Sequence, residues 1–131
     1  MHIEYQKIHR LGKDEVTGIL DHDVWVQEKI DWANLSIWLE DWDLNIGSRT
    51  KIIYQNGESL KEFRWAQEYV KNHEWIKRLL EDNPTYRLFW ERLVRHTVNY
   101  PPEYYNKFFL FDILDNGVFL ATDAVDVLAH E

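Results

Sequence analysis

One long amphipathic segment, residues 59–81, constrains the fold of this chain more than any other feature. Ser59 and Glu62 have the spacing of a capping box, in which the two side chains satisfy opposite backbone N–H groups at a helix start. Asn83 and Pro84 then mark the helix end. The apolar residues recur at near-helical spacing: Leu60, Phe63, Ala66, Val70, Ile76 and Leu80. We therefore expect one helix over residues 59–81, with its apolar side against a sheet.

The remainder of the chain favours strands. Runs rich in strand-forming residues occupy residues 3–8, 24–28, 33–39, 44–48, 86–94 and 108–114. Two of these runs flank Asp41-Trp42-Asp43 and predict a hairpin, although tight hairpin turns favour glycine where φ is positive. The pattern predicts an α+β fold, an antiparallel β-sheet with one long helix, in a single domain spanning residues 1–131.

Composition limits the classes of protein to which this chain could belong. The chain is 45% hydrophobic and 15% aromatic, which is typical of a folded globule. It has no apolar run long enough to cross a bilayer and no secretion signal at its start, so we expect no membrane partner and a cytoplasmic location. Without cysteine it has no thiolate ligands, and its six histidines lack metal-site spacing, so we expect no metal ligand set.

The net charge of −8 opposes non-specific attraction to nucleic acid, because neutralisation of phosphates supplies most of that affinity. An RNA contact would therefore require a local basic patch. Arg87, Arg92, Arg95 and Lys107 could form one, or they could be solvated charges at strand ends.

Four short motifs follow one another in a defined order. They are Lys29-Ile30-Asp31-Trp32-Ala33-Asn34, Ser48-Arg49-Thr50, Leu88-Phe89-Trp90-Glu91 and Phe109-Leu110-Phe111-Asp112-Ile113. In this order they resemble the ATP-dependent RNA ligase family, over the N-terminal part of its nucleotidyltransferase, or adenylation, domain. Two later motifs of that family, a Glu-Gly strand and a strand with paired lysines, are absent from the chain. The resemblance implies an ATP-grasp-like adenylation fold.

The resemblance implies a specific chemistry. Lys29 would attack the α-phosphate of ATP to form lysyl-AMP, and the AMP would pass to a nucleic-acid 5′-phosphate, with RNA ends as partners and ATP and Mg²⁺ as cofactors. Attack requires a neutral amine, which partial burial at the end of the apolar run 24–28 would favour.

The resemblance also assigns roles to further residues. Asp31 and Glu91 would lie near the ribose or the metal, Arg49 near phosphate or ribose, and Phe111 against the adenine ring. Glu28 and Asp112 would help to form the nucleotide site. Taken singly, these residues also fit ordinary roles: Lys29 as a strand-end lysine, Arg49 in a surface ion pair, Glu91 as a solvated residue and Phe111 in the core.

Seven tryptophans against five glycines is an unusual ratio. Five of them occupy positions where the family or a turn would accept glycine: Trp32, Trp42, Trp65, Trp75 and Trp90. We expect Trp32 and Trp90 to fill part of the adenylate pocket and to impair the chemistry. One alternative is an engineered, non-catalytic scaffold that forms homo-oligomers through exposed tryptophans. Another is a small nucleotide- or RNA-binding module without chemistry.

Overall fold

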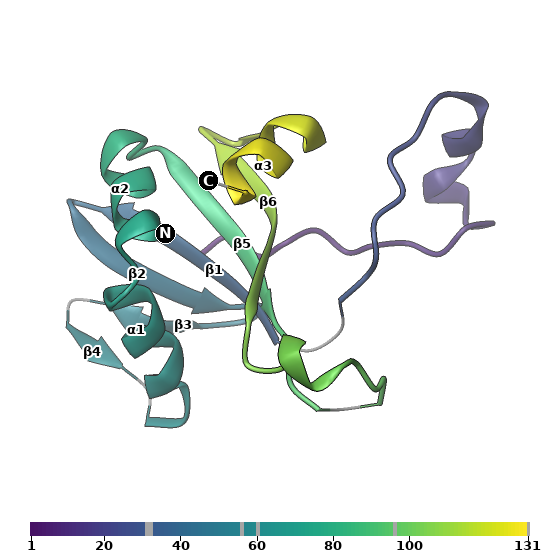
Figure 1. Ribbon diagram of the computed structural model, residues 1–131. Coiled ribbons are helices and arrows are strands. Elements are labelled where there is room, and N and C mark those ends of the chain that lie inside the picture. The colour runs from purple at the N-terminus through teal and green to yellow at the C-terminus, as the bar shows by residue number, and fades with distance from the viewer. Residues whose placement is uncertain (31–32, 56, 60, 96, 131) are drawn as a thin grey trace.

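The computed structural model describes the chain except for residues 31–32, 56, 60, 96 and 131 and the side chains of residues 59 and 62. In the described residues, seven strands form one antiparallel sheet in the order β4-β3-β2-β1-β5-β6-β7 (Figure 1). The strands are β1 (Ala33–Glu40), β2 (Asp43–Ser48), β3 (Ile52–Gln55), β4 (Glu58–Ser59), β5 (Tyr86–Arg92), β6 (Phe108–Asp115) and β7 (Val118–Phe119). The predicted α+β class and antiparallel sheet are confirmed.

Helices cover one face of this sheet, which we call the helical face (Figure 1). They are α1 (Arg64–Lys71), α2 (Glu74–Asp82) and α3 (Thr122–Ala129). Alternate residues of the central strands point to these helices, so that Leu35 and Leu88 join Val70, Ile76 and Val125 in one buried core. No helix among the described residues has both the length and the apolar character needed to span a membrane.

The expectation of one helix over residues 59–81 is wrong. The short 3₁₀ helix η3 (Lys61–Phe63) precedes α1, and a break at Asn72 and His73 separates α1 from α2. The break has a reason in the apolar pattern. A helix continuing from Val70 would present His73 and Lys77 to the sheet, whereas the extended backbone of His73 resets the phase so that Ile76 is buried. The capping-box side chains, Ser59 and Glu62, lie outside the described residues.

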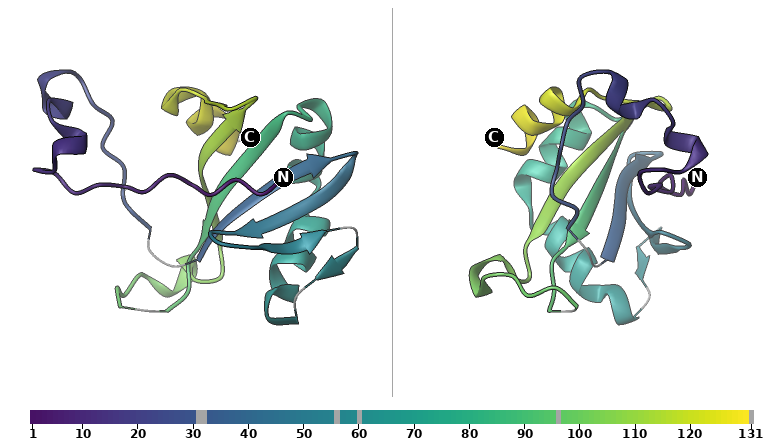
Figure 2. Two further views of the ribbon diagram at one scale, coloured as in Figure 1. Left: turned by 180° about the vertical axis from the view of Figure 1, so that it is seen from behind. Right: turned by 90° about the vertical axis from the view of Figure 1, so that its right-hand side faces the viewer.

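The predicted strands at residues 3–8 and 24–28 are also wrong. Residues 1–9, which we call the strap, are extended but pair with no strand, and they cross the face of the sheet opposite α1 and α2, which we call the strap face (Figure 2). The chain then forms a projecting arm with 3₁₀ helices η1 (Asp14–Val16) and η2 (Ile19–Asp21), and residues 22–30 return to β1. β1 already has β2 and β5 as neighbours, so these segments find no place beside it. Trp25 and Val26 of the return segment are exposed.

The hairpin around Asp41 and Trp42 is confirmed. Glu40 pairs with Asp43, which leaves a two-residue turn. Asp41 and Trp42 both have positive φ, 53° and 66°, as a type I′ turn requires. A non-glycine residue at positive φ is strained because its Cβ crowds the backbone.

We therefore expect Trp42→Gly to raise the free energy of unfolding by about 1 kcal/mol, since glycine removes the left-handed strain. Trp42 is 74% exposed, so little packing is lost. Urea denaturation would measure the change. Trp25→Gly is the matched control, because Trp25 is similarly exposed, at 67%, and has no positive φ. Equal effects of the two substitutions would contradict the turn argument.

Candidate functional site

The strap face carries a row of polar and aromatic residues at one end of the sheet. Asn34 of β1 is the register partner of Glu91 in β5, and Glu91 is the partner of Phe109 in β6. Register partners in antiparallel strands point to the same face, with Cβ atoms roughly 5 Å apart. Trp90 and Leu110, the neighbours of Glu91 and Phe109, pack in the core of the helical face. The row Asn34, Glu91 and Phe109 therefore lies on the strap face.

The next row contains a β-bulge that places two predicted site residues side by side. Phe89 is paired with Asp112, whereas Trp90 is paired with Leu110, so Phe111 is one extra residue in β6. A bulge of this kind re-aims side chains that would otherwise alternate between faces. The Phe111 ring lies 6.5 Å from that of Phe89, and Asp112 also reaches the strap face. The fold thus brings Phe111 and Asp112 next to the row that contains Glu91.

Tyr5 of the strap covers this second row. Its ring makes edge contacts with Phe89, Phe111 and Phe119, at centroid distances of 4.9, 5.1 and 5.8 Å. Its hydroxyl donates a hydrogen bond of 2.8 Å to the Asp112 carboxylate. Burial, followed by the effect of Asp112, raises the pKa of the Tyr5 hydroxyl above its usual range. Tyr5 is therefore held by both ends, through its ring and its hydroxyl.

Asp112 is a half-buried carboxyl group with two donors. Burial raises its pKa above the ordinary value, while hydrogen bonds from the Tyr5 hydroxyl and the Ile113 amide act in the opposite direction. A carboxyl group with a raised pKa in the folded state stabilises the fold only below that pKa. This contribution is lost as the pH rises through it.

We therefore expect Asp112→Asn to gain stability relative to the parent as the pH rises from about 4 to 7. The gain should stay below about 1 kcal/mol, because solvent screens a half-exposed group. Asparagine keeps an oxygen that can accept a hydrogen bond from the Tyr5 hydroxyl. Urea midpoints of both proteins across this pH range would measure the difference. A difference independent of pH would count against the assigned cause.

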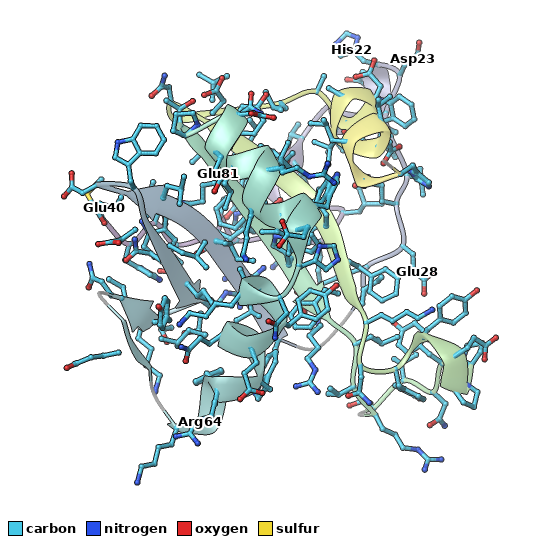
Figure 3. All side chains as sticks on the ribbon, turned by 60° about the vertical axis from the view of Figure 1, so that its left-hand side comes forward. His22, Asp23, Glu28, Glu40, Arg64 and Glu81 are labelled. Carbon is cyan, nitrogen blue, oxygen red and sulfur yellow. The ribbon has the colours of Figure 1, made fainter. Side chains whose placement is uncertain are left out.

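The predicted nucleophile, Lys29, lies near the end of the sheet where β1 begins. Lys29 is exposed on the return segment, four residues before β1 begins, a separation of at most roughly 14 Å between Cα atoms. Glu28 is exposed beside it, outside the sheet (Figure 3). The expected burial of Lys29 is wrong, because residues 24–28 form no apolar strand.

The other predicted residues differ in their placement. Arg49 is exposed in the turn after β2, at the end of the sheet where β1 begins, because Ser48 pairs with Leu35. Asp31 and Trp32 lie outside the described residues. Glu91, Phe111 and Asp112 are thus brought together on the strap face, while Lys29, Glu28 and Arg49 lie around the end of the sheet nearest to them.

Charge is segregated along the strand direction. Basic residues gather at the end where β1 begins, which we call the basic end: Arg49, Lys51, Lys61, Arg64, Arg92, Arg95 and Lys107. Acidic residues gather at the opposite end, which we call the acidic end: Glu40, Asp41, Asp43, Glu81, Asp82 and Asp115. Figure 3 shows Arg64 far from Glu40 and Glu81. Two of these cations contact the helical side, since Arg92 lies over the Trp65 ring at 4.0 Å and Lys51 lies over the Phe63 ring at 5.7 Å.

Comparison with known proteins identifies the family. A family model described as RNA ligase matches residues 22–131, which is most of the chain. The chain belongs to the RNA ligase family. Comparison with curated proteins gave no match. The predicted family is thus confirmed, and membership of it implies a nucleic-acid partner. The strap and the arm, residues 1–21, lie outside the matched region of this RNA ligase.

The tryptophans of the chain are not placed as expected. Trp90 was expected to fill the adenylate pocket, but its side chain points to the helical face, where it is 5% exposed and contacts Trp75 edge-on at 6.0 Å. The expectation is wrong because neighbouring residues of a strand point to opposite faces, so Trp90 and Glu91 cannot share a pocket. Trp65 and Trp75 are half-buried against the same core. Of the described tryptophans that were expected to drive self-association, Trp42 alone is exposed on the hairpin.

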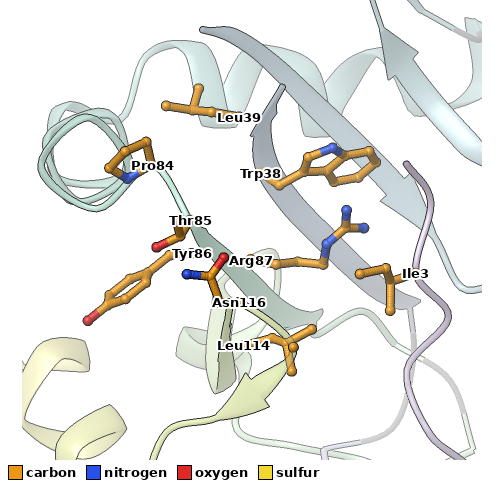
Figure 4. Close-up of a pocket in the computed structure, with 10 residues that line it drawn as sticks. Ile3, Trp38, Leu39, Pro84, Thr85, Tyr86, Arg87, Leu114 and Asn116 are labelled. Atoms are coloured by element: carbon orange, nitrogen blue, oxygen red, sulfur yellow. The ribbon is translucent and has the colours of Figure 1, made fainter. Parts of the chain in front are cut away.

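Arg87 does not lie at the basic end. It is 6% exposed near the acidic end, where its guanidinium stacks on Trp38 at 3.9 Å and donates a hydrogen bond to the carbonyl of Met1. Burial lowers its pKa to about 10. Beside it lies a cavity of about 230 Å³ whose walls include Ile3, Trp38 and Leu114 (Figure 4). This cavity contains none of the predicted site residues.

The structure adds two residues to the candidate site that the motifs do not single out. Asn34 ends the Lys29 motif and is the register partner of Glu91. The two-residue alternation of β1 and β5 was the signal that could have paired them. No local sequence pattern marks Tyr5 as a site residue, because the residues it contacts in β5, β6 and β7 are far from it in the sequence.

Proposed function

We propose that this RNA ligase binds ATP at the basic end of the strap face and transfers AMP to Lys29, and then to the 5′-phosphate of an RNA end. One observation carries the proposal. Glu91, Phe111 and Asp112, three residues of the motifs, share one face of the sheet, and Glu91 lies one register pair from the end where the Lys29 segment joins β1.

Each group has a chemical reason for its role. Ionised Glu91 accepts hydrogen bonds, as a ribose hydroxyl requires, and the face of Phe111 suits a purine ring. The guanidinium of Arg49 matches a phosphate group with two parallel hydrogen bonds. Asn34, opposite Glu91, offers both a donor and an acceptor to the same sugar. Glu28 lies next to the lysine in the sequence and is proposed to contribute to the same site, as is Asp31, which lies outside the described residues.

The transfer requires a neutral Lys29 amine. The amine nitrogen forms a bond to the α-phosphorus while the bond to the bridging oxygen breaks, so pyrophosphate leaves and the amine loses a proton to solvent. In the second step an oxygen of the RNA 5′-phosphate attacks the same phosphorus, and the lysine leaves as the amine. The product is an RNA end activated by AMP.

Mg²⁺ is proposed to bind with the nucleotide. No group of three or more histidine, aspartate or glutamate residues within the described part of the chain could hold a metal. Mg²⁺ at nucleotide sites commonly uses phosphate oxygens with one or two carboxylates, and Glu91 could supply one of these. When bound, the ion would neutralise charge on the triphosphate.

Labelled ATP tests the proposal. Incubation with Mg²⁺ and ATP labelled at the α-phosphate should give covalent label on the protein that is stable in alkali and released in acid, as expected of a bond between phosphorus and the lysine nitrogen, whereas ATP labelled at the γ-phosphate should give none. Addition of 5′-phosphorylated RNA should then move the label from protein to RNA, and RNA with a 5′-hydroxyl should leave it in place. ATP binding without covalent label would support the non-catalytic binding module instead.

A further inference from the structure

The ring of Tyr5 lies where the proposed function places the base of ATP. It contacts Phe111, the residue proposed to stack on adenine, and it also contacts Phe89 and Phe119. Its hydroxyl donates to Asp112 at 2.8 Å. A flat ring with a hydrogen-bond donor at its edge also describes adenine, whose exocyclic amino group is a donor. The Tyr5 side chain thus has the shape and polarity of the proposed ligand.

The strap buries this surface but does not supply a hydrogen bond to every polar group beneath it. Ser36 on the strap face is 2% exposed, and within the described structure its hydroxyl has no hydrogen-bond partner. Gly47 beside it leaves room for the His2 ring, since a Cβ on Gly47 would lie 3.0 Å from His2 and 3.1 Å from the Ser36 hydroxyl. A buried hydroxyl without a partner destabilises the covered state. A polar ligand that replaced the strap and formed a hydrogen bond with this hydroxyl would therefore bind the surface more favourably than the strap does.

The strap is held by isolated contacts. No ladder of strand hydrogen bonds holds residues 1–9, all of which are described. The Tyr5 hydroxyl donates to Asp112, and the His2 ring lies 2.8 Å from the Ser48 carbonyl. At the end of the strap, Arg87 donates to the Met1 carbonyl and the Met1 amino group pairs with Glu40 at 2.6 Å. The strap also lies outside the region that matches the family, so that region contains the proposed site without it.

We propose that Tyr5 occupies the base subsite of this ligase, so that ATP must displace the strap to bind, and that Asp112 then accepts the amino group of the base. This inference rests on the proposed function for the identity of the ligand. It adds that the chain carries its own competitor for the site, and that an acceptor selects bases with a donor at the corresponding edge.

Binding measurements on the full chain test the competition. Tyr5→Ala should bind ATP about tenfold more tightly than the parent, the factor that a pair of edge-to-face aromatic contacts typically represents. Glu4→Ala is the matched control, because Glu4 is an exposed neighbour on the same strap and should leave ATP affinity unchanged. Equal or weaker ATP binding by Tyr5→Ala would overturn the inference, as would the absence of ATP binding by both proteins.

A second measurement follows Tyr5 itself. With 3-fluorotyrosine at position 5, saturating ATP should move the ¹⁹F resonance to that of the solvent-exposed ring in the denatured chain. A resonance that stays in place while ATP is bound would overturn the displacement. If ATP releases Tyr5 but no label reaches Lys29, the proposed transfer fails and the inference survives. If Lys29 is labelled while the Tyr5 resonance does not move, the proposed transfer survives and the displacement of Tyr5 is wrong.

Base selection is tested in the Tyr5→Ala background, where the strap does not compete. ATP should bind about tenfold more tightly than purine riboside triphosphate, which lacks the amino group, because hydrogen bonds to charged groups are strong. Adding Asp112→Ala should bring this ratio close to one. A ratio that survives Asp112→Ala would show that another group reads the base.

Discussion

Lys29→Ala should reduce the covalent labelling of the protein by ATP at least about a thousandfold, as expected when a nucleophile is removed. The free energy of unfolding should change by less than about 0.5 kcal/mol, because the Lys29 side chain is exposed on a segment outside the sheet. Labelling with α-labelled ATP and urea denaturation would measure the two effects. Their separation distinguishes loss of a reacting group from loss of the fold.

Lys7→Ala is the matched control, because Lys7 is also exposed and lies in an extended segment without strand pairing. It should retain full labelling. Label that persists in Lys29→Ala would assign the reaction to another side chain, and peptide mapping of the labelled parent would identify it. Loss of label from both lysine variants would instead indicate an indirect effect of charge.

Trp90→Gly should destabilise the domain by about 4 kcal/mol, although the motif comparison places a glycine there. The indole is 5% exposed, fills the core between β5 and α2, and makes an edge contact with Trp75. Its loss leaves a cavity, and glycine in a strand adds an entropic cost. Urea denaturation would measure the change. ATP affinity of the folded fraction should stay as it is, because the side chain faces away from Glu91.

Trp42→Gly is the appropriate comparison, since the same change on the exposed hairpin is expected to have the opposite sign. Trp90→Phe should cost less than Trp90→Gly, because a phenyl ring keeps part of the packing. A Trp90→Gly variant of parental stability with tighter ATP binding would restore the idea that this indole blocks the nucleotide.

Local patterns predicted the centre of the sheet but not its surroundings. The hairpin of β1 and β2 was predictable because strand-forming runs flank a short turn, and β5 and β6 because each is rich in aromatic and aliphatic strand-forming residues. Residues 3–8 and 24–28 have the same local preference, but a strand also needs an edge beside which to pair. Which segments obtain that edge is decided by contacts distant in sequence.

The helix break and the site show two further limits. The interruption at His73 was present in the sequence as a loss of phase in the apolar pattern, and a stricter count of the spacing would have found it. Strand alternation was equally available, and it would have separated Trp90 from Glu91. The bulge at Phe111 was not predictable, because it depends on the register between β5 and β6. That register determines which motif residues meet.

The carboxylates of the β1–β2 hairpin and the cations Arg92 and Lys107 lie at opposite ends of the strands. A polyanion that approaches by diffusion would be repelled by the hairpin with Asp41 and Asp43 and attracted by the end with Arg92 and Lys107. Encounters would therefore occur with a preferred orientation, in which a strand terminus arrives beside the segment that carries Lys29. Such electrostatic steering weakens with added salt, because ions screen the charges over a Debye length of about 8 Å at physiological ionic strength. The rate of capture, more than the arrangement of the bound complex, would then depend on salt.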